Sequence, residues 1–302
     1  MQSVASGDIS DVRDAIGRIS KSTTVQPSRP TKGAAYFKDI PTYVINLDRR
    51  PDRWTEASGA LAKNKFTNVK RISAIDGGKI DMSQIKNMLT PEAFDSLGKV
   101  RKYDAALGSL GAIGCYLSHY KVWEEIYKSN KPGIIVEDDI SFNRQWDTAP
   151  IVANSHVLLG QWDFILLAAS VLFDTYREDQ NGMDKLKGKF YGTHFYYLTP
   201  KGAEFFIRGA IPIDYQVDSH MSFQYELNPN VIRAGVVIDS LASQSNMSTD
   251  IQTPTSWNSF ILMVNGRRYL DPITSIVHRA IFIILCILFI GVCGKLLSII
   301  LE

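Results

Sequence analysis

One short stretch, residues 133–140, constrains this chain more than any other segment. It reads GIIVEDDI, so an apolar run passes directly into three acids. The apolar run is too short for a helix and follows Pro132, which predicts a buried parallel strand. Glu137, Asp138 and Asp139 then stand at the carboxyl end of that strand, where open α/β sheets bind their ligands.

Three adjacent carboxylates repel one another, and the repulsion costs stability unless a cation or a positively charged partner offsets it. No His or Cys is near them in the sequence, and oxygen ligands alone suit Mg²⁺ or Mn²⁺. The stretch therefore indicates one of two things. It is either a metal site or a strand that ends in a solvated acidic turn.

The composition predicts a globular domain with a substantial core and argues against nucleic-acid binding. Hydrophobic residues make up 45% of the chain, charged residues make up 21%, and the net charge is only +2. No basic block with interleaved aromatic residues occurs. Of the three cysteines, Cys115 alone lies outside the apolar C-terminal segment, so no disulfide framework is predicted and a reducing compartment is favoured.

The two ends of the chain differ from the middle. Residues 1–33 are polar and contain no apolar core of a signal peptide, which predicts a flexible segment. Residues 276–301 are long and apolar enough for a single-pass membrane helix, although a buried C-terminal helix is the alternative. His278 and Arg279 precede this run, and positive flanks prefer the cytoplasmic side. We therefore expect a tail-anchored protein whose main domain, residues 34–270, faces the cytosol.

Alternating strand and helix signals fill the main domain. Apolar runs predict strands at 42–47, 69–75, 162–167, 190–198 and 236–238. Cap residues and first-turn prolines predict helices that begin near residues 51, 91, 109 and 200. The polar stretch 177–189 predicts a mobile loop of the kind that covers a binding site.

Several polar residues in these segments are open to two interpretations. Arg49 and Arg53 follow a strand and suit phosphates, but charged turns are usually only solvated. Gly111 and Gly114, at the start of the helix that contains His119, are costly unless a ligand or another backbone comes close. His119 is either a hydrogen-bonded packing residue or a ligand.

Five segments, in their order along the chain, carry a family resemblance. They are YVINLDRRPDR from Tyr43, AIDG from Ala74, GAIGCYLSH from Gly111, IVEDD from Ile135 and PID from Pro212. Together with a weaker match at 244–251, this pattern resembles glycosyltransferase family 25, which includes lipopolysaccharide glycosyltransferases and collagen galactosyltransferases. The resemblance implies a GT-A type, Rossmann-like α/β domain with a mixed, mostly parallel sheet. It also implies a UDP-sugar donor and a divalent cation, Mn²⁺ or Mg²⁺.

The same resemblance gives residues their expected roles. Metal ligands would be Asp139 and Glu137, with His220 as a further candidate. The nucleotide sugar would be bordered by Asn46, Arg49, Arg53, Asp76, Ser118, His119, Glu137 and Asp138. The region after Ile211 matches the family pattern poorly, so His220 and the base that takes the acceptor proton are our own candidates. The base would be Asp218 or Asp214, which would share one helix face if residues 214–218 are helical, although Asp214 would equally serve as a helix cap.

The predicted function is a membrane-tethered, metal-dependent glycosyltransferase. It would move a hexose, galactose or glucose, from a UDP-sugar to a glycan, glycoprotein or glycolipid acceptor, with inversion. One alternative is a catalytically inactive scaffold that keeps the fold at a membrane. Another is a metal-dependent phosphohydrolase, which would need more acids or histidines at other strand ends.

Overall fold

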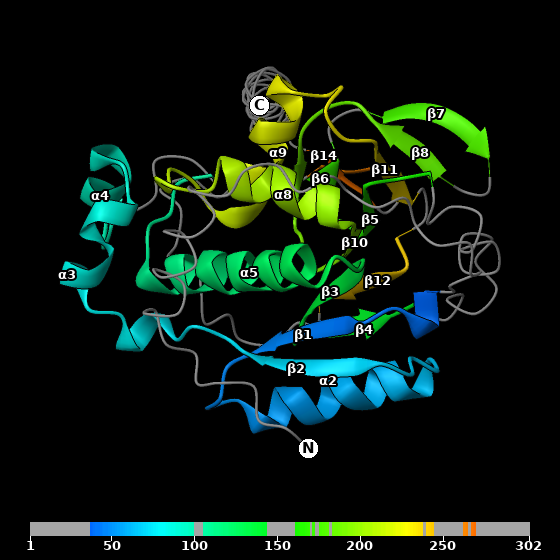
Figure 1. Cartoon of the computed structure of the whole chain (residues 1–302), viewed down its shortest axis with the longest axis horizontal. Coiled ribbons are helices and arrows are strands. Elements are labelled where there is room, and N and C mark those ends of the chain that lie inside the picture. The colour runs from blue at the N-terminus through cyan, green and yellow to red at the C-terminus, as the bar shows by residue number, and fades with distance from the viewer. Residues whose placement is uncertain are drawn as a thin grey trace, which may run out of the picture.

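The computed structural model describes residues 37–99, 105–143, 161–169, 171–172, 175–180, 183–237, 240–244, 262–264 and 267–269 (Figure 1). The predicted segments 1–33 and 276–301 lie outside these residues, so the flexible N-terminus and the membrane anchor stay predictions. Within the described part of the chain, no helix is both long enough and apolar enough to cross a membrane.

An eight-stranded mixed sheet forms the centre of the molecule. Its strand order is β2-β1-β3-β10-β5-β11-β8-β7. The strands are β1 (Thr42–Asn46), β2 (Val69–Ser73), β3 (Gly133–Glu137), β5 (Phe164–Ala168), β7 (Thr175–Gln180), β8 (Met183–Leu186), β10 (Phe195–Leu198) and β11 (Ala234–Val237).

The sheet is mixed, as expected, and six of its eight strands point the same way, although only three of the seven neighbouring pairs are parallel. The pairs β1–β2, β1–β3 and β5–β11 are parallel, whereas β3–β10, β5–β10, β8–β11 and β7–β8 are antiparallel. The main reason is β10, which enters the middle of the sheet in the opposite direction to both neighbours. An apolar run looks the same whichever way its strand points, so the sequence pattern could not reveal this direction.

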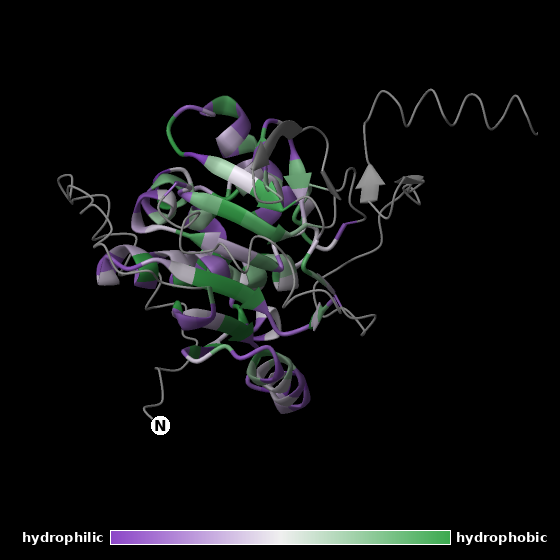
Figure 2. Ribbon diagram, turned by 90° about the vertical axis from the view of Figure 1, so that its right-hand side faces the viewer, coloured by the Kyte–Doolittle hydropathy of each residue, from purple (hydrophilic) through white to green (hydrophobic). Residues whose placement is uncertain are grey.

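Helices cover both faces of the sheet, as Figure 1 shows. The helices are α2 (Pro51–Lys63), α3 (Met82–Ile85), α4 (Pro91–Ser96), α5 (Leu110–Ser129), α8 (Pro200–Arg208) and α9 (Val217–Leu227), with short 3-10 turns η1 (Phe37–Asp39), η2 (Gly77–Lys79) and η3 (Lys86–Met88). Adjacent residues of β3 enter different cores, because Ile135 packs in the core with α5 and α8 while Ile134 and Val136 pack in the core with α2. Burial on both faces explains why the central strands are continuously apolar (Figure 2).

Short pairings complete the described fold. Strands β4 (Ile140–Phe142) and β12 (Ala242–Gln244) pair antiparallel just beyond the acids. A four-stranded sheet has the order β13-β14-β6-β9, with the strands β6 (Val171–Leu172), β9 (Phe190–Tyr191), β13 (Leu262–Val264) and β14 (Arg267–Tyr269).

Two predictions in this half of the chain were wrong. The stretch 177–189 is largely an antiparallel hairpin, β7–β8, at the edge of the main sheet rather than a loop. An edge strand has one neighbour and tolerates a polar sequence, so composition misled the prediction. The run 190–198 is two strands in different sheets, and Gly192 lies between them with a φ of 81°.

The predicted helix starts were confirmed. The side chains of Thr90, Ser109 and Thr199 accept hydrogen bonds from backbone N–H groups three residues later, which caps α4, α5 and α8. The helix α8 ends at Arg208, with Gly209 as its C-cap. A Cβ on Gly114 would lie 2.4 Å from the backbone oxygen of Ile75, so another backbone does approach the start of α5.

Candidate active site

The three acids lie where the sequence placed them, at the carboxyl end of β3. Glu137 is the last residue of that strand, and Asp138 and Asp139 follow it. Because β1 runs parallel to β3, its own carboxyl end, Asn46, lies at the same edge of the sheet. Side chains from the two strands therefore meet there.

Asp138 is a buried acid held from two sides. Its Oδ2 accepts a 2.7 Å hydrogen bond from Asn46, and its Oδ1 pairs with the Arg53 guanidinium at 3.0 Å. Burial raises the pKa of Asp138, and Asn46 and Arg53 offset only part of that rise. Asn46 and Arg53, expected beside a nucleotide, thus both contact an acid of the cluster.

Asp139 lacks such a partner on one oxygen. Its Oδ1 is buried and has no hydrogen-bond partner within the described residues. Burial, together with the charges of Glu137 and Asp138, raises the pKa of Asp139 from 3.8 to about 7. A divalent cation fits this position, because it would offset the crowded charge and because carboxylate oxygens suit Mg²⁺ or Mn²⁺.

Glu137 faces basic side chains instead. Its Oε1 lies 3.5 Å from His119 Nε2, and its Oε2 accepts a 3.4 Å hydrogen bond from Gln244 on β12. Burial opposes ionisation of Glu137, but His119, His194 and Arg53 together hold its pKa below the usual value. Glu137 therefore ionises more readily than Asp139, although the two acids are only two residues apart.

His119 is fixed by an aromatic pair. Its Nδ1 lies 2.8 Å from the Tyr196 hydroxyl, which also accepts a 2.8 Å hydrogen bond from Trp123. The His119 and Tyr196 rings are stacked with centroids 5.8 Å apart. The structure thus confirms the packing interpretation of His119, whose Nε2 faces Glu137, and the ligand interpretation stays a prediction.

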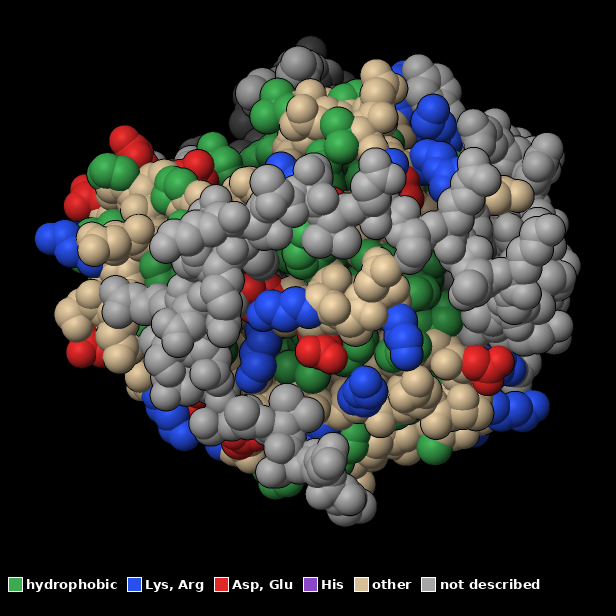
Figure 3. Space-filling view, in the orientation of Figure 1, with side chains coloured by type: hydrophobic (Ala, Val, Ile, Leu, Met, Phe, Trp, Pro, Cys, Tyr) green, Lys and Arg blue, Asp and Glu red, His purple; other side chains and the backbone are tan. Residues whose placement is uncertain are grey.

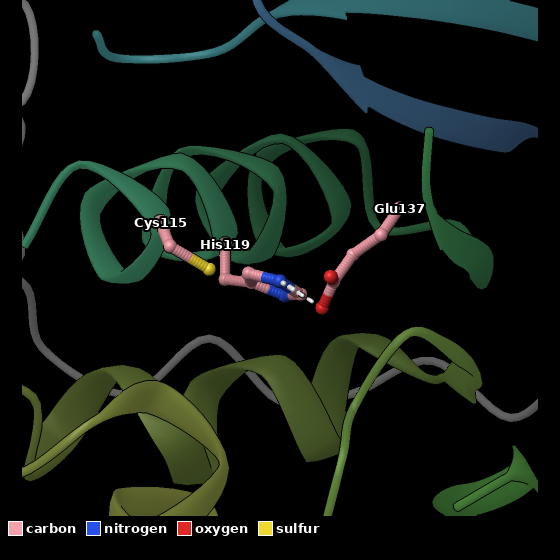
Figure 4. A group of neighbouring side chains, drawn as sticks. All are labelled: Cys115, His119 and Glu137. Atoms are coloured by element: carbon pink, nitrogen blue, oxygen red, sulfur yellow. Dashed lines mark ion pairs between the residues drawn. The ribbon is translucent and has the colours of Figure 1, made fainter. Parts of the chain in front are cut away.

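Cys115 lies one helical turn before His119 on α5. Ligand atoms of Cys115, His119 and Glu137 all lie within 4.8 Å of one another (Figure 4). Burial and the charges of the nearby acids raise the pKa of the Cys115 thiol well above its usual value. No His or Cys is near the acids in the sequence, but α5 brings Cys115 and His119 close to Glu137 in space.

His194 is a site residue that the sequence did not reveal. Its side chain is buried, and its backbone oxygen accepts a 2.9 Å hydrogen bond from Glu137 N. Burial lowers the pKa of His194, while the charge of Glu137 opposes this shift. No motif contains His194, and it reaches the acids only because β10 pairs antiparallel with β3.

The two candidate bases are in different environments. Asp218, in the first turn of α9, accepts hydrogen bonds from Gly192 N at 3.0 Å and Ser219 N at 2.7 Å. Burial raises its pKa, and the charge of Glu137 adds to the rise. Asp214 is exposed and precedes α9, which begins at Val217, so the two acids do not share a helix face.

The remaining predicted site residues lie around this centre. Ser118 Oγ donates to Gly114 O at 2.6 Å and accepts from Ile75 N at 2.8 Å, which ties α5 to the turn after β2. Arg49 forms an ion pair with Asp76 at 3.1 Å.

His220 lies in an aromatic environment. Its ring is 5.3 Å from that of Tyr116 and 6.3 Å from that of Trp123, between centroids, and its Nε2 lies 3.4 Å from Phe206 O. Burial lowers its pKa to about 4. The structure thus gives this side chain a packing role and does not test it as a ligand.

The sequence profile described as glycosyltransferase family 25 (LPS biosynthesis protein) matches residues 39–221. The chain belongs to this family. The match contains β1, α5, the acids of β3 and Asp218.

Relatives within the family carry different functional names. The chain is 27% identical over 214 residues to the human inactive glycosyltransferase 25 family member 3, covering 66% of this chain and 35% of that protein. It is 31% identical over 149 residues to human procollagen galactosyltransferase 2, covering 49% of this chain and 22% of that protein. A glycosyltransferase 25 family member of Anopheles gambiae is 27% identical over 201 residues, with shares of 62% and 32%. The matched part of the chain thus covers only 22–35% of the length of these three relatives.

Proposed function

We propose that this chain is a metal-dependent glycosyltransferase that moves a hexose, galactose or glucose, from a UDP-sugar to a glycan, glycoprotein or glycolipid acceptor with inversion. The observation that carries the proposal is Asp139, a crowded acid with a pKa of about 7 and a buried oxygen that lacks a hydrogen-bond partner within the described residues. Galactose is favoured because one relative is named a procollagen galactosyltransferase. The chain's membership of glycosyltransferase family 25 supports the same reaction class.

The acids of β3 would form the donor site. Asp139 and Glu137 would hold the divalent cation, Mn²⁺ or Mg²⁺, which supplies Lewis-acid stabilisation to the departing nucleoside diphosphate. Asn46 and Arg53 fix the side chain of Asp138, and Asp138 or Glu137 would contact the ribose or a metal-bound water. On the described part of the face in Figure 3, Lys and Arg side chains are intermixed with Asp and Glu, and no continuous basic surface suited to an extended polyanion is seen there.

Asp218 is the favoured base for the acceptor. As the acceptor oxygen attacks the anomeric carbon, its proton would pass to Asp218 while the bond to the diphosphate breaks. Two backbone N–H groups orient the carboxylate, which still has lone pairs for a proton. The pKa of Asp218, raised by burial, strengthens it as a base. The two contacts also suit a purely structural role, in which Asp218 fastens the turn at Gly192 to α9.

The proposal is tested with the full-length chain and a panel of nucleotide sugars. We expect Mn²⁺-dependent release of nucleoside diphosphate from one donor, lost with a chelator and reduced about 100-fold or more in Asp139→Asn. Asp95→Asn makes the same chemical change at an exposed position on α4 and should keep its rate. Equal rates in Asp139→Asn and Asp95→Asn would exclude Asp139 from catalysis.

The choice of base is tested by a second matched pair. Removal of a general base typically costs about 100-fold to 10,000-fold in rate, so Asp218→Asn should lose that factor in kcat. Asp214→Asn, at the exposed position, should lose little. The reverse order would assign the base to Asp214. A loss of folding in Asp218→Asn, seen as a lower melting temperature, would favour the structural role instead.

A non-catalytic binding protein is the second candidate, favoured by the relatives that are named inactive. It predicts that a nucleotide sugar with Mn²⁺ raises the melting temperature although no donor in the panel turns over. Cleavage of phosphate esters without nucleotide-sugar binding would favour the phosphohydrolase.

We also propose that residues 276–301 tether the domain to a membrane on its cytosolic side, which would suit a membrane-bound acceptor.

A further inference from the structure

We propose that Cys115, His119 and Glu137 form a second, distinct metal site that takes a thiophilic transition-metal ion such as Zn²⁺. The site shares Glu137 with the proposed donor site but not Asp139. Binding of Zn²⁺ does not depend on the transferase reaction. Its consequence, inhibition of sugar transfer, does rest on the proposed function.

The three side chains come from two elements that face each other. Cys115 and His119 stand four residues apart on α5 and thus on one face of that helix, and Glu137 ends β3 (Figure 4). All three ligand atoms lie within 4.8 Å of one another. Ligand atoms on one tetrahedral ion are roughly 3.5 Å apart, so the side chains need to close by about an ångström.

The His119 ring is the strongest sign of a ligand. It is fully buried, and its Nε2 has no hydrogen-bond partner within the described residues. The nearest acid oxygen, Glu137 Oε1, lies 3.5 Å away, longer than a normal hydrogen bond but close to the separation of two ligands on one ion. The buried nitrogen therefore has only this long contact with Glu137, and a metal ion between the two groups would give it a close partner.

The surroundings of His119 match those of metal-bound histidines. Such histidines usually donate the other ring N–H to an acceptor, which fixes the ring. Here Nδ1 lies 2.8 Å from the Tyr196 hydroxyl, whose position is fixed by the hydrogen bond from Trp123. The oxygen of Tyr196 has two lone pairs and is able to accept from both rings.

The ligand types separate this site from the hard-cation site. A thiolate, an imidazole and a carboxylate together suit Zn²⁺, whereas Mg²⁺ and Mn²⁺ prefer oxygen ligands. Binding would release the thiol proton of Cys115 to solvent. Occupancy would draw Glu137 toward α5 and place two positive charges beside the acids. Both effects would weaken binding of the hard cation that transfer requires.

The experiment titrates the full-length chain with Co²⁺, a spectroscopic substitute for Zn²⁺. We expect a near-ultraviolet charge-transfer band typical of a Co²⁺–thiolate bond, and we expect Zn²⁺ to displace it. Cys115→Ser should abolish the band, and His119→Gln should weaken Zn²⁺ binding about tenfold or more. The Cys286→Ser/Cys293→Ser double variant, which changes the other two cysteines of the chain, should keep the band. Asp139→Asn should also keep it.

A missing band, or a band that persists in Cys115→Ser, would overturn the proposal. Where sugar transfer is measurable, the Zn²⁺ concentration for half-inhibition, relative to each variant's own uninhibited rate, should rise about tenfold in Cys115→Ser. An unchanged value would show that occupancy does not inhibit transfer. If no donor turns over, the Co²⁺ band still decides the site, so failure of the proposed function and failure of this inference are distinguishable.

Discussion

Carboxylates at the two opposite ends of the central strands, the buried Asp163 and the half-buried Asp139, are compensated in different ways. Asp163 precedes β5 at the edge where Gly133 begins β3, and Asp139 follows β3 at the other edge. Asp163 Oδ2 accepts a 2.9 Å hydrogen bond from Arg233 N and pairs with Lys201 at 3.1 Å. Asp139 stands beside two further acids, and its pKa is raised to about 7.

This difference separates a structural carboxylate from a candidate functional one. The first edge compensates its acid with partners from the chain itself, so the charge contributes to the fold. The second edge compensates Asp138 with Arg53 but leaves Asp139 crowded by like charge. Uncompensated charge in a cluster of acids is typical of a site that completes itself with a bound group.

The largest effect should come from Arg53→Met. This change leaves Asp138 as a buried acid without its cation, and breaking such a pair typically costs about 3–5 kcal/mol in the free energy of unfolding. Urea unfolding followed by tryptophan fluorescence measures the loss. Lys99→Met, which breaks an exposed pair with Asp95, should change stability by less than about 1 kcal/mol. Similar losses in both variants would mean that burial of the Arg53–Asp138 pair contributes little.

An intermediate loss is expected at the other edge, in Asp163→Ala. The backbone N–H of Arg233 loses its acceptor and Lys201 loses its partner, which should cost about 1–3 kcal/mol. The same unfolding assay reports it, with Asp95→Ala as the exposed control. A gain of stability would contradict the claim that this edge is internally compensated.

The smallest effect, and one of opposite sign, is expected for Asp139→Asn without metal. Because the folded pKa of about 7 lies above the usual 3.8, ionisation of Asp139 destabilises the fold increasingly as the pH rises from about 4 through 7. The amide removes that charge. The full rise in pKa corresponds to about 4 kcal/mol, and solvent screening of the half-buried side chain reduces the expected gain in stability at about pH 8, with a chelator, to about 1–2 kcal/mol. The gain should disappear near pH 4, where wild-type Asp139 is protonated.

Addition of Mn²⁺ should reverse the stability order of the wild type and Asp139→Asn. At about pH 8 the ion should raise the melting temperature of the wild type and leave that of Asp139→Asn unchanged, since the ion binds the ionised acid. A stabilising gain that stays constant with pH would show that the charge of Asp139 is not its cause.

Local sequence patterns predicted much of the fold and part of the site. The strand at 133–137, the caps at Ser109 and Thr199 and the acids after β3 follow from residues only a few positions apart. The hairpin β7–β8 and the direction of β10 did not follow, because a polar edge strand resembles a loop and an apolar run has no direction. His194 was missed because it reaches the acids only through the antiparallel pairing of β10 with β3.

The sequence by itself determined that acids stand at a strand end, which helices flank them and which family the motifs resemble. The tertiary structure decided which acid is compensated, because Arg53 and Asp138 are separated by 85 positions and Asn46 and Asp138 by 92. It also brought Cys115 and His119 to Glu137. Propensities and caps act over a few residues, whereas contacts across such separations depend on strand order and helix packing, which no local pattern encodes.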